Sequence, residues 1–371
     1  MSNPFTYGRV VQSLNFCPRP STAKQLVGHI KARHNVVLQG ERRVGKTSLI
    51  YEVSRQLKSH RLLYIDLLEV KSVDDVCKRL ARAIFALEKQ GNLFEKALKL
   101  LSKLRPTLSL DPVSGEPSIA LDTRETSRPE SLEELLDLVG VLARRKPLLV
   151  AIDEFQDILN LDQARTVLAI LRSKIQFQTK IPYVFSGSIR NAMHEIFNDA
   201  ASPFFKSAIA MELGPLDRQL FIRFLKQKFV RTKRSVDPLV WNELLSTVCE
   251  NPGDVQQLCG ALWEVTPVRQ KITMAHMSDA MQLIYSREAK GYEATLVQLT
   301  AQQMKCLCTL ARLPELTPYT KAFLEASGIR QPGSVKKSLQ RLTQLKIIYL
   351  QEQHLRFINP FFRTWLLWKG Y

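Results

Sequence analysis

The 371-residue sequence predicts an α/β domain with a parallel sheet, followed by a helical segment and a C-terminal winged helix-turn-helix. Three observations predict this fold class. Short apolar runs alternate with helical patterns up to Pro215, as in parallel sheets that helices cover on both faces. Strand signals then stop over residues 216–290. From about Thr300, three helical patterns precede short strands, the order of a winged helix.

The predicted strands of the first domain are short and apolar, and a helical pattern follows each of the first three. They span residues 35–39, 61–68, 147–155 and 181–188. The predicted helices span residues 21–32, 45–59, 72–91, 131–146 and 163–176. Ser21 and Ser72 are suited to cap two of these helices. This alternation predicts βαβ units and therefore parallel strands.

Composition and pattern divide the chain into an N-terminal arm, a sheet domain, a helical lid and a winged-helix domain. The predicted ranges are 1–20, 21–215, 216–290 and 291–371. Inside the sheet domain, alternating apolar residues on both sides of a Pro/Ser/Gly turn predict an inserted β-hairpin at about 105–122.

Net charge and cysteine usage narrow the classes of partner and compartment. The formal net charge is +18, from 53 Lys and Arg against 35 Asp and Glu. Such an excess either indicates a polyanionic partner or serves solubility. The six cysteines form no CxxC pair, which argues against a zinc site and fits a reducing cytoplasm. With no apolar run long enough to span a bilayer and no signal peptide, we expect a cytoplasmic protein without a membrane partner.

The stretch from Gly40 to Thr47 matches the GxxxxGK[ST] pattern of phosphate-binding loops. Glycines let backbone N–H groups wrap a phosphate, and the positive end of the following helix points at the anion. Lys46, expected to be exposed, reaches the β- and γ-phosphates, and Thr47 ligates Mg²⁺. The predicted ATP contacts come from Gly40, Glu41, Arg42, Arg43, Val44, Gly45, Lys46, Thr47 and Ser48. For the two arginines, a solvated loop surface explains the charge as well as phosphate contact does.

A second motif supplies the carboxylates of such a site. The apolar run of residues 148–152 ends in Asp153 and Glu154. An Asp at the carboxyl end of a central parallel strand lies beside the phosphate loop and can hold Mg²⁺. Glu154 can polarise a water for in-line attack on the γ-phosphate. An acidic pair that only ends a strand is the alternative, and the phosphate loop upstream argues against it.

A third element lies at the end of the next strand, residues 181–188. Ser186 is placed either to touch the γ-phosphate or its attacking water, or simply to fit a tight turn. Arg190 and Lys206 follow on the loop segments. Each is a candidate cation for the phosphate of a neighbouring subunit in a nucleotide-dependent homo-oligomer, although an ordinary surface charge is the favoured interpretation of either residue taken alone.

Together these stretches resemble the AAA+-related P-loop ATPases of the STAND clade, specifically the archaeal and bacterial family with a C-terminal winged helix. The resemblance implies an AAA+-like fold, ATP as ligand, and residues near the adenine at Phe16, Arg19 and the lid turn Pro252. The sequence departs from the family pattern at Lys206–Ser207, where members often carry Gly-Arg, and at the lid turn "NPGD". The stretches that carry it are "PFTYGRVVQSLNFCPR", "GERRVGKTS", "LLVAIDEFQ", "YVFSGS", "MELGPLDRQLFIRFLKQKF", "CENPGDVQQLCGALW" and "LRFINPFFRTWL".

The C-terminal region predicts a helix-turn-helix with a basic third helix. We expect Ser334 to begin that helix and four cations to lie along it: Lys336, Lys337, Arg341 and Lys346. Recognition helices use such residues on bases and phosphates of a major groove. A solvated helix face, or a surface for protein docking or autoinhibition, has the same composition.

Two functions from different classes fit these observations. In the first, ATP binding and Mg²⁺-dependent hydrolysis, slow or partner-regulated, control binding of the winged helix to double-stranded DNA or a protein partner. In the second, a DNA-binding regulator or adaptor holds its nucleotide structurally, with negligible turnover. Glu154 favours the first, because a structural site needs no carboxylate to activate water.

Overall fold

The computed structural model describes residues 2–87, 106–110, 117–121, 129–188, 190–351 and 354–371. Two compact units are present. One comprises residues 10–215, and the other combines residues 1–9 with 216–371. The N-terminal arm predicted at 1–20 is therefore divided between the units.

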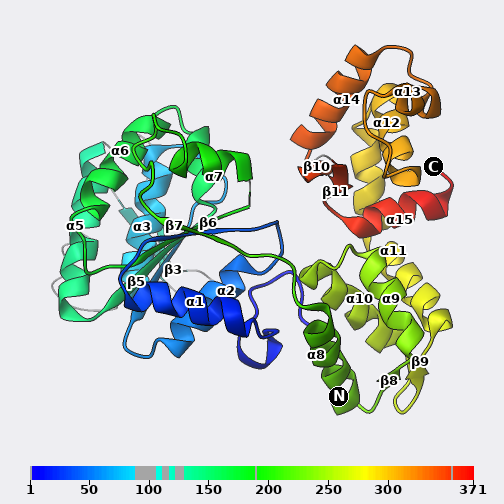
Figure 1. Cartoon of the computed structure of the whole chain (residues 1–371), viewed down its shortest axis with the longest axis horizontal. Coiled ribbons are helices and arrows are strands. Elements are labelled where there is room, and N and C mark those ends of the chain that lie inside the picture. Colours follow the sequence, from blue (N-terminus) through cyan, green and yellow to red (C-terminus); the bar gives the residue numbers. More distant parts are fainter. Residues whose placement is uncertain (1, 88–105, 111–116, 122–128, 189, 352–353) are drawn as a thin grey trace. The chain divides into compact units, whose positions relative to one another are not determined.

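The first unit contains a five-stranded, wholly parallel sheet in the order β2-β5-β6-β1-β7. Figure 1 shows this unit as a sheet enclosed by helices. This confirms the predicted α/β class. The fifth strand, β7, was not predicted, because only Met211 of its four residues is buried and the alternation is too short to show. The strands are β1 Val36–Gln39, β2 Arg61–Asp66, β5 Leu148–Asp153, β6 Tyr183–Gly187 and β7 Ile209–Glu212.

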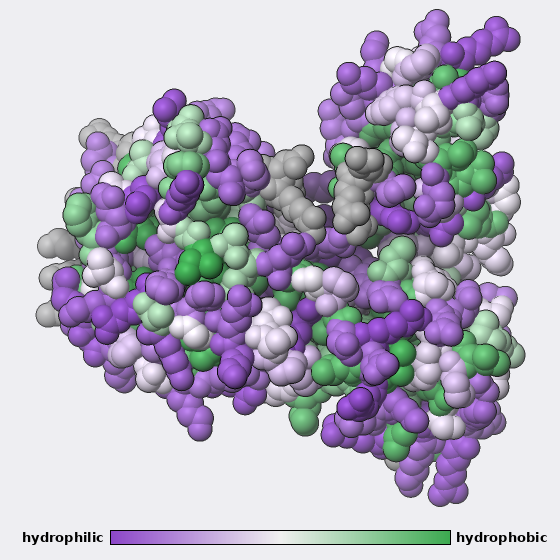
Figure 2. All heavy atoms as spheres, viewed as in Figure 1, coloured by the Kyte–Doolittle hydropathy of each residue, from purple (hydrophilic) through white to green (hydrophobic). Residues whose placement is uncertain are grey.

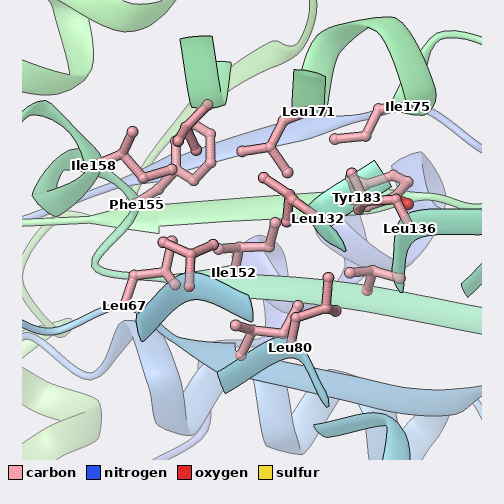
Figure 3. Packing of buried hydrophobic residues seen from close by; sticks show 14 of the residues in the cluster. Leu67, Leu80, Leu132, Leu136, Ile152, Phe155, Ile158, Leu171, Ile175 and Tyr183 are labelled. Atoms are coloured by element: carbon pink, nitrogen blue, oxygen red, sulfur yellow. The ribbon is translucent and has the colours of Figure 1, made fainter. Parts of the chain in front are cut away.

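Helices cover both faces of this sheet. The helices are α1 Pro20–Lys31, α2 Lys46–Gln56, α3 Val73–Leu87, α5 Pro129–Arg145, α6 Ala164–Ile175 and α7 Arg190–Phe197, with 3-10 turns η1 Ser13–Asn15 and η2 Phe155–Asn160. On one face, α1 and α2 pack on Leu38 and Ala151. On the other, α3, α5 and α6 pack on Ile152 and Tyr183 (Figure 3). Strands buried on both faces explain the uninterrupted apolar runs.

The predicted hairpin insertion is present. Strand β3, Pro106–Leu110, pairs antiparallel with β4, Pro117–Leu121. The remaining residues of the predicted range, 105, 111–116 and 122, lie outside the described part of the chain.

The helical part of the second unit contains α8 Arg218–Arg231, α9 Pro238–Thr247, α10 Pro252–Val265 and α11 Met274–Val297. Two very short strands, β8 Ser235–Val236 and β9 Lys271–Ile272, pair in parallel between them. The first residues of the chain pack here: Phe5 is buried with its ring 4.6 Å from that of Phe229, and Lys228 donates to the carbonyl of Pro4. Helix α11 is continuous across the predicted boundary at 290.

The C-terminal part has helices α12 Ala301–Arg312, α13 Lys321–Ser327, α14 Pro332–Gln344 and α15 Pro360–Lys369, with strands β10 Ile348–Gln351 and β11 His354–Phe357 forming an antiparallel pair. This is the predicted winged helix. Asn359, which caps α15, also donates to Glu288 of α11. Among the described residues, no helix is both long enough and apolar enough to traverse a bilayer. Hydrophilic residues cover most of the face seen in Figure 2.

Candidate functional site

The loop between β1 and α2 has the backbone conformation that its glycines were expected to allow. Gly45 has φ +101° and precedes the first residue of α2. A Cβ on Gly40 would lie 2.7 Å from the carbonyl oxygen of Leu213, so only glycine permits this close approach. Arg43 also has a positive φ, 64°, and is exposed with Arg42 at the loop tip.

Lys46 is buried, which corrects the expectation that it is exposed. Its side chain is only 5% exposed, and Nζ donates to the carbonyl oxygens of Gly40 and Glu41, both at 2.9 Å. A buried ammonium needs hydrogen-bond acceptors in place of water. The carbonyl oxygens of the loop supply them here. Burial lowers the pKa of Lys46, and the carboxylates of Glu154 and Asp153 oppose that shift.

Asp153 lies at the centre of a hydrogen-bond network at the end of β5. Its Oδ2 accepts hydrogen bonds from the Thr47 hydroxyl at 2.5 Å and the Tyr64 hydroxyl at 2.8 Å. Its Oδ1 accepts from the Ser186 hydroxyl and from the backbone N–H of Glu154. The structure thus brings Thr47, Asp153 and Ser186 together. Hydroxyl and carboxylate oxygens are the hard ligands that Mg²⁺ prefers, so the side chains of Thr47 and Asp153 fit the metal.

Tyr64 was missed by sequence reasoning. It lies on β2, whose register with β5 sets Tyr64 opposite Ala151, two residues before Asp153. Burial, followed by the charge of Asp153, raises the pKa of Tyr64. The phenol therefore stays protonated and remains a donor to the carboxylate.

Glu154 adopts a left-handed backbone conformation, φ +50°, that non-glycine residues rarely take. One carboxylate oxygen, Oε2, accepts hydrogen bonds from Gln156 Nε2 at 2.7 Å and Ser188 Oγ at 3.1 Å. Neither partner was identified from the sequence. The local sequence gives no signal for Gln156, because it stands between Phe155 and Asp157 just after the end of a strand, where a polar side chain is ordinarily exposed.

The two cations proposed for a neighbouring subunit's phosphate lie on the segment between β6 and β7. Arg190 is the first residue of α7, and its side chain lies outside the described part of the chain. Lys206 is exposed, with its ammonium 5.2 Å from the ring centroid of Phe205.

Residues from the N-terminal arm contact the phosphate loop and the start of α2. Phe16 is buried in the apolar cluster that includes Val44. Arg19 donates to the carbonyl of Val44 at 2.9 Å and to that of Gly214 at 2.8 Å, and burial lowers its pKa. The hydroxyl of Ser48 accepts the N–H of Val11. Arg19 therefore fastens the loop to the segment after β7.

Pro252 lies in the other unit. It is the first residue of α10, and the side chain of Asn251 caps that helix by accepting the N–H of Gly253. Proline suits this position because its missing N–H would have no partner within the helix.

The basic residues of the winged helix are exposed, but one is misplaced by the sequence prediction. Lys336, Lys337 and Arg341 lie on the outer side of α14, whose buried side chains are Val335, Ser338, Leu339 and Leu342. The helix begins at Pro332 and ends at Gln344. Lys346 therefore lies beyond it, in a turn with φ 55°.

Two family models match the chain: an AAA domain over residues 29–192, and a probable winged helix domain over residues 290–368. The chain joins an AAA domain to a winged helix. A Walker-type ATPase of Pyrococcus abyssi has a similar structure, with 18% sequence identity and a TM-score of 0.66. The match covers 98% of this chain and 99% of that chain. This AAA and winged-helix chain therefore has the fold of an AAA+-related P-loop ATPase.

Two further solved structures share the fold. The ORC2 protein of Aeropyrum pernix, described in ADPNP–ADP complexes, is 15% identical with a TM-score of 0.55, and 99% of each chain is covered. The ORC1 protein of the same organism, in complex with DNA, is 13% identical with a TM-score of 0.54, covering 95% of this chain and 93% of that one. Identities this low establish the fold alone. A search of curated proteins gave no match.

Proposed function

We propose that the protein binds and hydrolyses ATP with Mg²⁺, slowly or under partner control, and that its nucleotide state controls DNA binding through the winged helix. One observation carries the proposal. The Asp153 carboxylate is hydrogen-bonded to the Thr47 hydroxyl at the start of α2, and the carboxylate of Glu154 follows immediately in the chain. This pair supplies both a metal-binding oxygen set and a base.

The residues divide the work of hydrolysis. Backbone N–H groups of the loop and the start of α2 bind the phosphates, and Lys46 exchanges its two carbonyl partners for phosphate oxygens. Thr47 and Asp153 hold Mg²⁺, which neutralises charge on the phosphates when bound. Glu154 accepts a proton from the attacking water, and Ser186 keeps the Asp153 carboxylate oriented.

The DNA part of the proposal is supported by α14. Its buried residues lie on one side and its three exposed cations on the other, which is the arrangement of a helix that presents charge to a phosphate backbone. The ORC1 relative of like fold was solved in complex with DNA. We further propose that the protein is a nucleotide-dependent switch of the STAND type, which its motifs resemble, and that it acts in the cytoplasm.

Turnover measured with and without duplex DNA tests the proposal. We expect Glu154→Gln to keep ATP bound and to stop hydrolysis, because the amide preserves shape but accepts no proton. A variant that hydrolyses ATP at the parental rate would show that Glu154 is not the base. A parental protein that binds ATP without measurable turnover, with or without DNA, would favour the structural-nucleotide alternative.

A further inference from the structure

Gln156 is a buried amide directly beside the base proposed above. It lies on η2, two residues after Glu154, and is only 4% exposed. Both of its Nε2 hydrogens are used on carboxylates: Nε2 donates to Glu154 Oε2 at 2.7 Å and to Asp157 Oδ1 at 3.0 Å. A buried amide is retained at a cost unless its hydrogen bonds are needed, so its position calls for a reason.

The orientation of this amide is set by the two carboxylates. Rotating it by half a turn would direct its oxygen at both of them, where lone pairs would repel. In the observed orientation, Gln156 Oε1 has no hydrogen-bond partner within the described part of the chain. The protein leaves a buried acceptor unpaired and keeps both N–H bonds to the carboxylates. An apolar side chain of similar volume would fill the space without that cost, so packing alone does not explain a glutamine here.

Gly187, at the end of β6, admits the amide. A Cβ at this position would lie 2.4 Å from Gln156 Oε1 and 2.6 Å from Met193 Sδ. Real Cβ atoms do not approach so closely, so any larger residue would push the Gln156 side chain away. The glycine is thus required by the close approach of the amide oxygen, and its φ lies outside the left-handed region.

The position of Gln156 is in turn fixed by Asp157, which is itself hydrogen-bonded to the backbone. Asp157 is buried, and its second oxygen, Oδ2, accepts the backbone N–H of Glu69 at 2.7 Å. A continuous chain of hydrogen bonds therefore runs from the loop after β2 through Asp157 and Gln156 to the carboxylate of Glu154. The amide cannot swing freely, so it constrains the carboxylate that it binds.

The consequence for Glu154 is that its two oxygens differ. Oε2 receives both hydrogen bonds, from Gln156 and Ser188, while Oε1 has none from the described residues. The left-handed backbone at Glu154 fixes the direction in which this side chain leaves the strand end. A base acts only when its free oxygen is within hydrogen-bond reach of the proton it takes.

We infer that Gln156 is a positioning residue for hydrolysis: it fixes Oε2 of Glu154 so that Oε1 faces the attacking water. This inference rests on the proposed role of Glu154 as base. Gln156 itself touches neither nucleotide nor water in this assignment. Its effect should appear in kcat, because misplacing a reacting group by about 1 Å costs on the order of a hundredfold in rate while substrate binding elsewhere is retained.

The test is a series at position 156 in the full-length protein, with kcat and KM for ATP, ATP affinity and melting temperature measured for each variant. Gln156→Met keeps the length and removes the donor, and we expect kcat to fall about ten- to a hundredfold with KM and affinity near parental values. Gln156→Glu keeps the shape of the side chain but places a third carboxylate against those of Glu154 and Asp157, which repel it. We therefore expect a larger loss in kcat. A packing role would make these two variants equal.

Gly187→Ala provides an independent route, because its Cβ displaces the amide without changing residue 156. We expect the same loss in kcat as for Gln156→Met. Gly28→Ala is the matched control, since a Cβ there meets no atom within 4 Å, and it should leave kcat unchanged. If Gln156→Met does not fold, the Gly187→Ala and Gln156→Glu measurements decide the question.

Pairing with Glu154→Gln separates positioning from general damage. In that background the base is absent, so Gln156→Met should not lower the residual single-turnover rate further; an equal factor in both backgrounds would overturn the inference. Parental kcat in Gln156→Met or in Gly187→Ala would overturn it as well. If Glu154→Gln itself hydrolyses normally, the proposed function fails, and the positioning role fails with it.

Discussion

Replacing Tyr64 by Phe removes one hydrogen bond from the network around Asp153 and little else. The hydroxyl donates to Oδ2 at 2.8 Å, and Asp153 is only 3% exposed, so water cannot readily replace the donor. The ring would keep its contact with Tyr51, whose centroid is 5.2 Å away. The change therefore isolates one bond to a buried carboxylate.

The expected loss is about 2 kcal/mol in the free energy of unfolding, since a hydrogen bond to a charged group contributes roughly 1.5–3 kcal/mol. Three donors to Asp153 remain, from Thr47, Ser186 and the N–H of Glu154, so the unit should still fold. With a urea dependence of about 2 kcal/mol per M, the midpoint should fall by about 1 M. Because the pKa of Tyr64 is raised, the donor is protonated at neutral pH and the loss should not vary between about pH 6 and 8.

The assay is urea unfolding of the unit that contains Tyr64, followed by far-ultraviolet circular dichroism, with Tyr51→Phe as control. The Tyr51 hydroxyl has no hydrogen bond among the described residues, and its removal should shift the midpoint by less than a quarter as much. Equal midpoints for Tyr64→Phe and the parental protein would refute the reasoning, as would equal shifts in the two variants.

Three further outcomes test the site and the winged helix. Lys46→Ala should abolish ATP binding in calorimetric titration, because the phosphates lose their buried cation; unchanged affinity would remove the central assignment. Asp153→Asn should weaken ATP binding in the presence of Mg²⁺ far more than with the metal chelated, and equal losses in both conditions would contradict its role as a metal ligand. Replacing Lys336, Lys337 and Arg341 together by Ala should weaken DNA binding and flatten the slope of log affinity against log salt by about three units, with basal ATPase activity retained. An unaltered slope would instead point to a protein partner on α14.

The sequence by itself determined those parts of the site that depend on neighbours along the chain. The loop from Gly40 to Thr47 has a fixed spacing, because backbone wrapping and the start of a helix are local events. The apolar run before Asp153 likewise predicted a buried central strand and the place where its carboxylate emerges. Since parallel strands end at one edge, those two motifs also predicted that Thr47 and Asp153 would meet.

Only the tertiary structure decided which side chains from distant segments complete the site. Tyr64 reaches Asp153 because β2 pairs with β5 in one particular register, and Gln156 reaches its position because Gly187 of another strand leaves room. Lys46 is buried because the loop folds over it, which no local pattern records. Lys346 was predicted to lie on the third helix of the winged-helix domain, but α14 ends two residues earlier, at Gln344. For Tyr64 and Gln156 the deciding term is a contact between residues far apart in the sequence, and periodicity or spacing carries no information about such contacts.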